Sequence, residues 1–199
     1  MKYSEKFIER FRKRATFTTG DAKRFLVSLG ASCGYASVFL SNAVKRGTVK
    51  RLAHGVYSFQ SEPDSSLAEA AFSPAYHGLQ DALSIHGLWE QETIPVLVTP
   101  RRVKQGVRCI AGGKILVRRI ARKMFFGFES VRVHGGESWT RVSDVEKTLI
   151  DFVYFKAPLG GEALTEIAGR LNEKKLGEYL ARSPAWVARR VRKLLSRRK

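Results

Sequence analysis

Apolar residues recur at helical spacing in two neighbouring segments of residues 18–59. The first predicts a helix over residues 21–29, which Thr18 and Thr19 can cap. Asp21 falls in its first turn, where a negative charge suits the helix dipole. The second segment predicts a helix from Gly34 to Arg46. Its apolar face holds Ala36, Phe39, Leu40, Ala43 and Val44, and its outward face holds Tyr35, Ser37, Ser41, Asn42 and Lys45.

Residues 49–59 change to the pattern of two short strands joined by a turn near Ala53-His54-Gly55. Helix, helix and basic two-stranded ribbon follow one another in the order of a winged helix-turn-helix. Cationic side chains lie where the ribbon, or wing, meets DNA phosphate. A DNA-binding module is therefore the favoured interpretation of residues 1–60.

The second half mixes the two periodicities. Strands are expected over 94–98, 107–110, 114–118 and 128–133, and helices over 67–71, over 79–86 and over a segment that runs to about Phe155. Ser143 and Glu146 have capping-box spacing for the last of these, two more helical stretches follow, and Ser183-Pro184 starts a final helix. In that final helix Trp186 is expected on the apolar face with Val187 and Val191.

These patterns predict an α+β protein: an N-terminal winged helix-turn-helix, then a small mixed or antiparallel sheet packed with helices. Residues 61–66 are polar and rich in turn formers, so they are the expected linker. The expected domains are 1–60, which binds DNA, and 67–199, which ends in a basic helix.

The charge balance strengthens the DNA-binding interpretation. Lys and Arg number 36 against 18 Asp and Glu, a formal net charge of +18, which indicates a polyanionic partner. Residues 1–60 hold 12 basic and 3 acidic side chains, half of the excess. A membrane surface is the weaker choice, because no apolar run approaches the roughly 20 residues that span a bilayer and no signal-peptide core is expected at the start. Cys33 and Cys109 lack CxxC spacing, which fits a reducing cytoplasm.

The outward face of the second helix and the wing supply the candidate contacts. Asn pairs with adenine edges, Ser and Tyr with edges or phosphate, and the cations with phosphate or the minor groove. An ordinary solvated helix face is the alternative. The candidate DNA-binding residues are Thr18, Thr19, Lys23, Arg24, Tyr35, Ser37, Ser41, Asn42, Lys45, Arg46, Lys50, Arg51 and His54.

Two clusters invite an enzymatic interpretation. In the first, His77 and Asp81 are expected to share a helix face, but His86 falls about 140° away by the helical period, and zinc-site spacing is missing. A half-buried structural histidine is favoured.

The second cluster combines Ser143, Asp144, Glu146 and Lys147, which open a helix instead of spreading along neighbouring strands as a metal nuclease requires. Gly112-Gly113-Lys114 lacks the spacing of a P-loop. No catalytic residue, metal or cofactor is therefore expected.

Four segments together resemble the AbiEi family of antitoxins from prokaryotic type IV toxin–antitoxin systems. They occur in family order and cover most of the chain. They are the wing end Arg51-Leu52-Ala53-His54-Gly55-Val56-Tyr57, residues 75–88 (AYHGLQDALSIHGL), the strand Ile94-Pro95-Val96-Leu97-Val98-Thr99, and residues 142–151 (VSDVEKTLID). The resemblance implies a winged helix that represses its own operon, and a second domain needed to neutralise a toxin of the nucleotidyltransferase type.

The resulting prediction is a cytoplasmic, non-enzymatic regulator whose partner is double-stranded operator DNA and which acts on any toxin indirectly. Two alternatives stay open at this point. One is a nuclease or nucleotide-processing enzyme that uses the winged helix for targeting. The other makes the basic C-terminal helix an element that binds RNA or a membrane surface.

Overall fold

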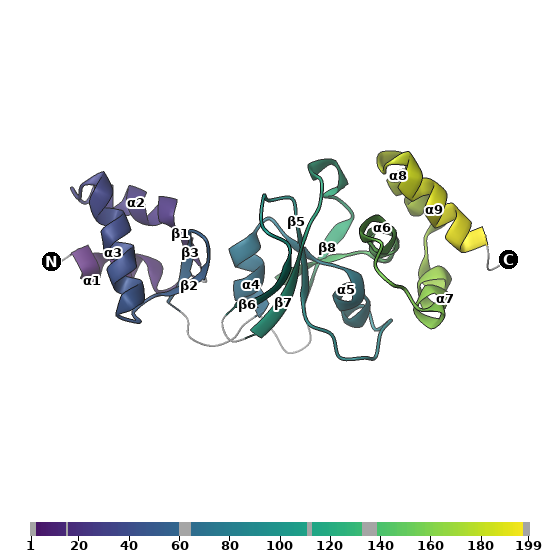
Figure 1. Ribbon diagram of the computed structural model, residues 1–199, viewed down its shortest axis with the longest axis horizontal. Coiled ribbons are helices and arrows are strands. Elements are labelled where there is room, and N and C mark those ends of the chain that lie inside the picture. The colour runs from purple at the N-terminus through teal and green to yellow at the C-terminus, as the bar shows by residue number, and fades with distance from the viewer. Residues whose placement is uncertain (1–2, 15, 60–64, 111–112, 133–138, 197–199) are drawn as a thin grey trace. The chain divides into compact units, whose positions relative to one another are not determined.

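The computed structural model describes residues 3–14, 16–59, 65–110, 113–132 and 139–196 (Figure 1). The chain divides into two compact units. The first comprises Met1–Ser73 and Cys109–Lys114, and the second Pro74–Arg108 and Ile115–Lys199. Residues 60–64, most of the expected linker, lie outside the described residues, and the expected domain limits stay a prediction.

The first unit is the winged helix-turn-helix that the sequence predicts. Its small sheet has the strand order β1-β3-β2 with both pairings antiparallel. Its elements are α1 (Tyr3–Phe11), β1 (Phe17–Thr18), α2 (Thr19–Ser28), α3 (Cys33–Lys45), β2 (Lys50–Ala53), β3 (Val56–Ser58) and α4 (Ser65–Phe72).

The core of this unit is built largely from phenylalanine rings. Phe7 and Phe11, one turn apart on α1, lie with their ring centroids 4.7 Å apart, and Phe17 meets Phe7 edge-on at 5.4 Å. All three are buried, together with Leu26 of α2 and Leu40 of α3. Such aromatic pairs contribute roughly 0.5–1.5 kcal/mol each beyond their buried area. Helix α1, which the sequence patterns did not single out, therefore holds α2 and α3 in place.

A six-stranded mixed sheet covered by helices lies mostly in the second unit. The strand order is β6-β7-β5-β4-β9-β8, with β4 parallel to β9, β5 parallel to β7, and β4–β5 and β8–β9 antiparallel. The strands are β4 (Tyr76–His77), β5 (Val96–Thr99), β6 (Gly106–Ile110), β7 (Gly113–Arg119), β8 (Phe128–Arg132) and β9 (Trp139–Ser143). The strands β4 and β9 were not predicted.

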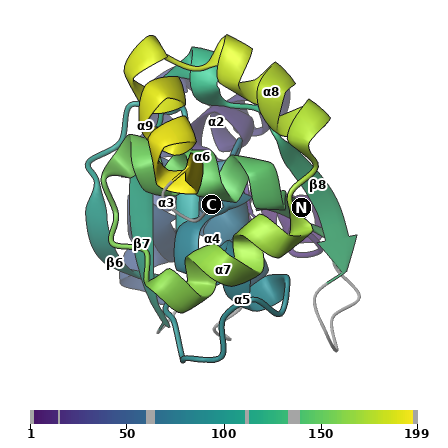
Figure 2. The ribbon, with the colours of Figure 1, turned by 90° about the vertical axis from the view of Figure 1, so that its right-hand side faces the viewer.

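The helices of this unit are arranged around α6. They are α5 (Leu79–Ile85), the short 3-10 helix η1 (Arg122–Met124), α6 (Val145–Phe155), α7 (Gly161–Arg170), α8 (Glu173–Arg182) and α9 (Ala185–Ser196). Figure 2 shows α7, α8 and α9 grouped about α6. The α+β class is as predicted, and two details of the predicted helices are corrected.

The first correction concerns the start of α6. Asp144, not Ser143, is the N-cap, because its side chain accepts a hydrogen bond from the Lys147 amide at 2.8 Å. The second concerns α9, where Val187 and Val191 are fully buried but Trp186 is 41% exposed. The indole therefore lies outside the apolar face that the sequence pattern assigned to it.

Gly127, between η1 and β8, provides a test of how tightly this unit is packed. Its φ of +70° is one that side-chain-bearing residues rarely adopt, and a Cβ there would lie 2.8 Å from both Lys147 Cβ on α6 and Tyr179 Cε2 on α8. We expect Gly127→Ala to lower the free energy of unfolding by roughly 1–3 kcal/mol. Urea denaturation followed by far-UV circular dichroism measures the effect.

Gly177→Ala on α8 is the matched control. A Cβ at Gly177 meets nothing within 4 Å, so the better helix propensity of alanine should raise stability by about 0.5–1 kcal/mol. Equal unfolding midpoints for the two variants would contradict the close packing at Gly127.

Candidate DNA interface

The N-terminus of α2 is closed by a capping box between Thr18 and Asp21. The Asp21 amide donates to Thr18 Oγ1 at 3.1 Å, and the Thr18 amide and hydroxyl donate to Asp21 Oδ2 at 2.9 and 2.7 Å. These hydrogen bonds from Thr18 hold the pKa of Asp21 below its ordinary value. Arg24 adds an ion pair with Asp21 at 2.6 Å. Two expected DNA contacts, Thr18 and Arg24, are thus engaged in capping α2.

Helix α3 is fixed by Ser32, whose side chain caps it one residue earlier than expected. Ala36 and Leu40 are fully buried, and Phe39, Ala43 and Val44 are partly buried, so the predicted inward face is confirmed. The five residues assigned to the outward face are all exposed: Tyr35, Ser37, Ser41, Asn42 and Lys45.

The outward residues of α3 fall into two stripes. Ser37, Ser41 and Lys45, four apart in sequence, follow one edge of the helix. Tyr35 and Asn42 follow the other edge, which faces α1. The candidate residues of α3 are therefore not one uniform surface, and Val38 lies between the stripes.

Val38 is a residue that the sequence analysis passed over. Its side chain is 58% exposed in the outward centre of α3. An apolar group in that position can contact the methyl group of thymine in the major groove. The signal was its helical position, but an apolar residue type does not stand out in a search for polar contacts.

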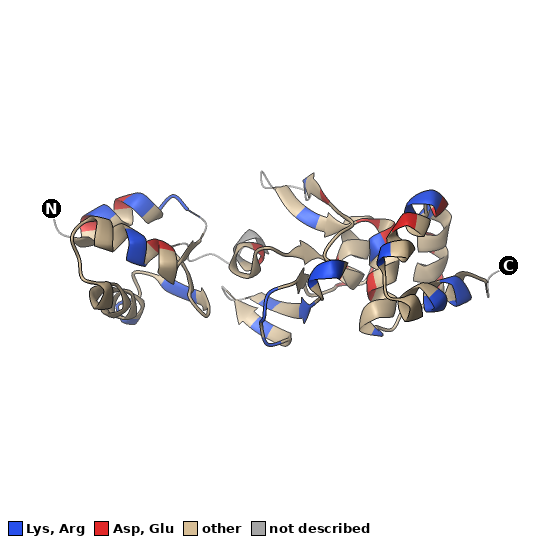
Figure 3. Ribbon diagram, turned by 90° about the horizontal axis from the view of Figure 1, so that it is seen from above, with Lys and Arg blue, Asp and Glu red and all other residues tan. Residues whose placement is uncertain are grey.

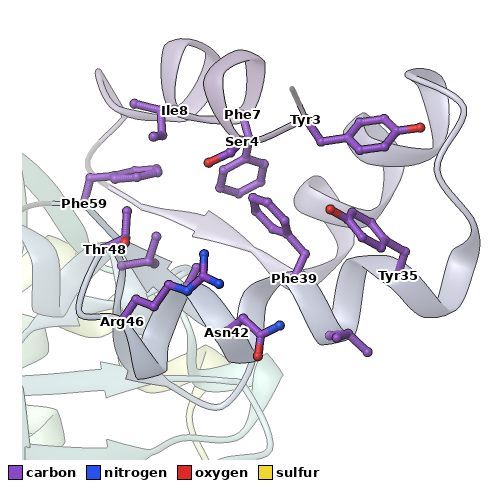
Figure 4. A pocket seen from close by; sticks show the side chains of 13 residues that line it. Tyr3, Ser4, Phe7, Ile8, Tyr35, Phe39, Asn42, Arg46, Thr48 and Phe59 are labelled. Carbon is purple, nitrogen blue, oxygen red and sulfur yellow. The ribbon is translucent and has the colours of Figure 1, made fainter. Parts of the chain in front are cut away.

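The second stripe borders a groove of about 550 Å³ between α1 and α3 (Figure 4). Phe7 and Phe39 give it an apolar wall, and Tyr35, Asn42 and Arg46 lie along its α3 side. Arg46, a candidate phosphate contact, is thus beside Asn42 at the end of the helix that leads to the wing.

The wing carries its cations on an exposed ribbon tied to α2. The side chains of Lys50, Arg51 and His54 are exposed, and Arg51 Nη2 lies 3.1 Å from His54 Nδ1. The Thr19 amide donates to the Gly55 carbonyl at 2.9 Å, with Gly55 at a φ of +72° in the turn. This bond fixes the wing turn against the first turn of α2, and Lys23 is exposed in the next turn of that helix.

The histidine cluster of the second unit is structural in its contacts. His77 and Asp81 do not share a helix face, because His77 lies on β4 and Asp81 on α5. Their side chains meet at 2.6 Å, Asp81 also accepts from the Val96 amide, and His86 Nε2 lies 2.7 Å from the Ser143 carbonyl. These side chains hold α5 against the sheet.

The acidic cluster at the start of α6 is also occupied by internal contacts. Asp144 accepts from Tyr179 and lies 3.0 Å from Lys175 Nζ, and Glu146 accepts from the Asn172 amide. Burial and the hydrogen bond to Asp144 raise the pKa of Tyr179 to about 12.

Lys147, the last member of that cluster, is fully buried and paired with the equally buried Asp151. Its Nζ donates to Tyr76 Oη at 3.0 Å, and Tyr76 donates to Asp151 at 2.7 Å. Burial lowers the pKa of Lys147 and raises that of Asp151. A closed group of this kind offers no access to a substrate.

Over the described ranges of the chain, no three His, Cys, Asp or Glu side chains come close enough together to hold a metal ion. Cys33 and Cys109 are free and exposed. Gly112 of the rejected P-loop lies outside the described residues, and Lys114 is on β7. Among the described helices, none has both the length and the apolarity to cross a bilayer.

Comparison with protein families agrees with the geometry of the first unit. Residues 5–60 match the family model described as "Transcriptional regulator, AbiEi antitoxin". No curated protein matches the chain. The resemblance to AbiEi antitoxins is thereby confirmed for the segment that contains α1 to β3.

The capping box should make the stability of the first unit pH-dependent. Thr18→Ala removes the side-chain cap and should cost about 1 kcal/mol at neutral pH. Because the folded pKa of Asp21 lies below its unfolded pKa, its contribution is present above the unfolded pKa and is lost as pH falls through the folded pKa. The difference between wild type and Thr18→Ala should therefore shrink in acid.

Thermal unfolding followed by circular dichroism between about pH 3 and pH 7 measures this difference. Ser28→Ala is the control, since its hydroxyl bonds the Phe25 carbonyl at the other end of α2. If the loss of stability caused by Thr18→Ala stays the same down to the lowest pH, Asp21 does not act through the cap.

Proposed function

We propose that the protein is a DNA-binding transcription regulator that places α3 in the major groove of an operator and the wing on flanking phosphate. One observation carries the proposal. The segment that matches antitoxin regulators folds into a capped helix-turn-helix, whose second helix presents an exposed polar face beside a basic ribbon.

The contacts divide by role. Asn42 can bond an adenine edge in a bidentate manner, Ser37 and Ser41 can bond base edges or phosphate, and Val38 can meet a thymine methyl. Lys45, Arg46, Lys50 and Arg51 suit phosphate, as does the N-terminus of α2 at Thr19. His54, adjoining Arg51, suits the phosphate or minor-groove side of the wing. Lys23 and Arg24 would contact the DNA backbone. Arg24 would then leave its ion pair with Asp21 and bind a phosphate instead.

We also propose a biological setting for this activity. The regulator would act in the cytoplasm as the autorepressing antitoxin of a type IV toxin–antitoxin operon. The second unit would be needed to neutralise a toxin of the nucleotidyltransferase type indirectly, without enzymatic activity of its own. The match to antitoxin regulators over residues 5–60 supports this setting.

Binding to DNA should separate into two kinds of contact. Lys50→Ala and Arg51→Ala should each weaken binding to every duplex alike and reduce the salt slope by about 1. Asn42→Ala should instead cost roughly 1–3 kcal/mol on the operator and little on scrambled DNA. The operator duplex is taken from the upstream region of the gene, and the control duplex is a scrambled version of it. Fluorescence anisotropy titrations on both duplexes at several salt concentrations distinguish the two kinds of contact.

Lys174→Ala on α8 is the charge-matched control, because it removes one exposed cation from the other unit. Equal weakening of both duplexes by Asn42→Ala, or no effect of the wing substitutions, would contradict the proposed docking. Unchanged binding after deletion of residues 1–60 would reject the DNA-binding role of the first unit.

Autorepression has its own readout. A reporter gene placed behind the chain's own upstream region should be repressed by wild-type protein and released by Asn42→Ala, which leaves the fold intact because Asn42 is exposed. Repression that is equal for the two proteins would argue against operator reading by α3.

A further inference from the structure

Three adjoining hollows on the second unit share residues and form one continuous surface. A hollow of about 620 Å³ at the end of β7 shares Trp186 with a second hollow along α9, and each shares a residue, Lys156 or Arg190, with a third. We call this surface the basic strip. Its cations are Arg118, Arg119, Lys123, Lys156, Arg189, Arg190 and Lys193.

The charged side chains of the basic strip are all positive. No Asp or Glu lines any of the three hollows within the part of the chain that the structure describes. On α9 the charged residues are all Lys or Arg, as the helix next to the C label in Figure 3 shows. Uncompensated cations packed this closely repel one another, so the surface favours an anionic partner.

Trp186 gives this surface a flat aromatic platform. Its indole is 41% exposed and stacks on Tyr154 of α6 with centroids 6.1 Å apart and planes 22° apart. Helical spacing puts Arg189, Arg190 and Lys193 on the same face of α9. One indole face is supported from below by Tyr154, while cations follow it along the helix.

Arg118 of the basic strip has a hydrogen-bond donor without a partner. Its guanidinium lies 5.9 Å from the Phe155 ring centroid, and its buried Nε has no hydrogen-bond partner among the described residues. A buried donor without a partner is costly, and a planar guanidinium is suited to phosphate oxygens. The Arg118 side chain is partly exposed in this hollow, where its guanidinium can meet a phosphate oxygen.

We propose that the basic strip binds single-stranded nucleic acid, with phosphates on the cations and one base stacked on Trp186. Cations interleaved with an exposed aromatic ring are the pattern that single-strand binding uses. Bases inside a duplex already stack on their neighbours and offer no free face. This site is separate from the duplex-reading surface of the first unit.

An anionic membrane surface is less well matched. A helix that lies in a membrane interface inserts its apolar face among the lipids. The apolar face of α9 is instead committed to the core of the second unit, where Val187 and Val191 are fully buried. Among the large apolar side chains described on α9, Trp186 is the exposed one, and it is stacked on Tyr154.

Stacking is tested by substituting the platform in the full-length protein. Lys50→Ala and Arg51→Ala are present in every variant, to suppress binding by the wing. We expect Trp186→Ala to weaken binding of a fluorescein-labelled 12-nucleotide uridine RNA, and of the matching thymidine DNA, by about 5- to 150-fold in fluorescence anisotropy. Trp186→Phe should retain most of the affinity. Trp139→Ala, which removes a 63% exposed tryptophan on β9, should change nothing.

The phosphate contacts are tested by salt dependence. The double substitution Arg189→Ala and Arg190→Ala should lower the slope of log affinity against log salt by about 0.7 for each lost phosphate contact. Arg132→Ala with Lys174→Ala removes the same charge outside the basic strip and should leave the slope unchanged. Circular dichroism confirms that each variant is folded.

Several outcomes decide the proposal. Binding of RNA alone, of DNA alone or of both supports it and identifies the preferred sugar. An affinity for the oligonucleotides that is indifferent to Trp186→Ala overturns it, as does oligonucleotide displacement by polyglutamate of equal charge. Binding to vesicles of anionic lipid that depends on Trp186, with none to oligonucleotides, assigns the surface to membranes and also overturns it.

Single-strand binding at the basic strip and operator binding by the first unit can be tested independently. In protein with the natural wing, Trp186→Ala should leave operator duplex binding unchanged, whereas Asn42→Ala should leave single-strand binding unchanged. Loss of both activities in Trp186→Ala would show that the basic strip is not a separate site.

Discussion

The arrangement of the second unit depends on the buried ion pair between Lys147 and Asp151, two residues one turn apart on α6. Taking two charges out of water costs several kcal/mol for each ion after relaxation, so such a pair persists only when its hydrogen bonds are satisfied. Here Lys147 donates to Tyr76 and Asp151, and Tyr76 donates to Asp151. Because Tyr76 belongs to β4, α6 can satisfy both charges in only one position against the sheet.

The position of α6 in turn fixes the positions of the helices that pack around it. Helices α7, α8 and α9 all contact α6, and Asp144 at its N-terminus holds Tyr179 and Lys175 of α8. Its other end supplies Tyr154, the support for Trp186. The carboxylates of Asp144 and Glu146 thus fix helices against one another.

Local signals made the first unit predictable. Thr18 and Asp21 are three residues apart, so the hydrogen bonds that cap α2 are formed by residues close together in the sequence. Gly55 likewise marks the wing turn by its own backbone requirement. Helix α1 gives a weaker signal, because Phe7 and Phe11 become informative only when Phe17 and α3 pack against them.

Errors in the second unit also have physical causes. Strand β4 has two residues, and it is held by β5 and β9, which are distant in sequence. His77 and Asp81 were placed on one helix because four-residue spacing fits a helix, yet a strand followed by a helix brings them together equally well. Trp186 was counted as apolar, although the amphipathic indole is often placed at a surface where one face is supported and the other is accessible. Residue type alone does not tell whether a tryptophan is buried in the core or supported on one face at the surface.

The two nucleic-acid surfaces that we propose depend on different physics, so salt would weaken their binding to different degrees. Binding by α3 and the wing would gain most of its affinity from counterion release, with a slope of about −0.9 per duplex phosphate contact. Binding at the basic strip would have the shallower slope of single strands, about −0.7 per contact, plus base stacking on Trp186, which releases no ions. For equal numbers of phosphate contacts, rising salt therefore weakens duplex binding faster. A net charge of +18 makes both interactions strong at low salt, so their separate specificities are best resolved at higher ionic strength.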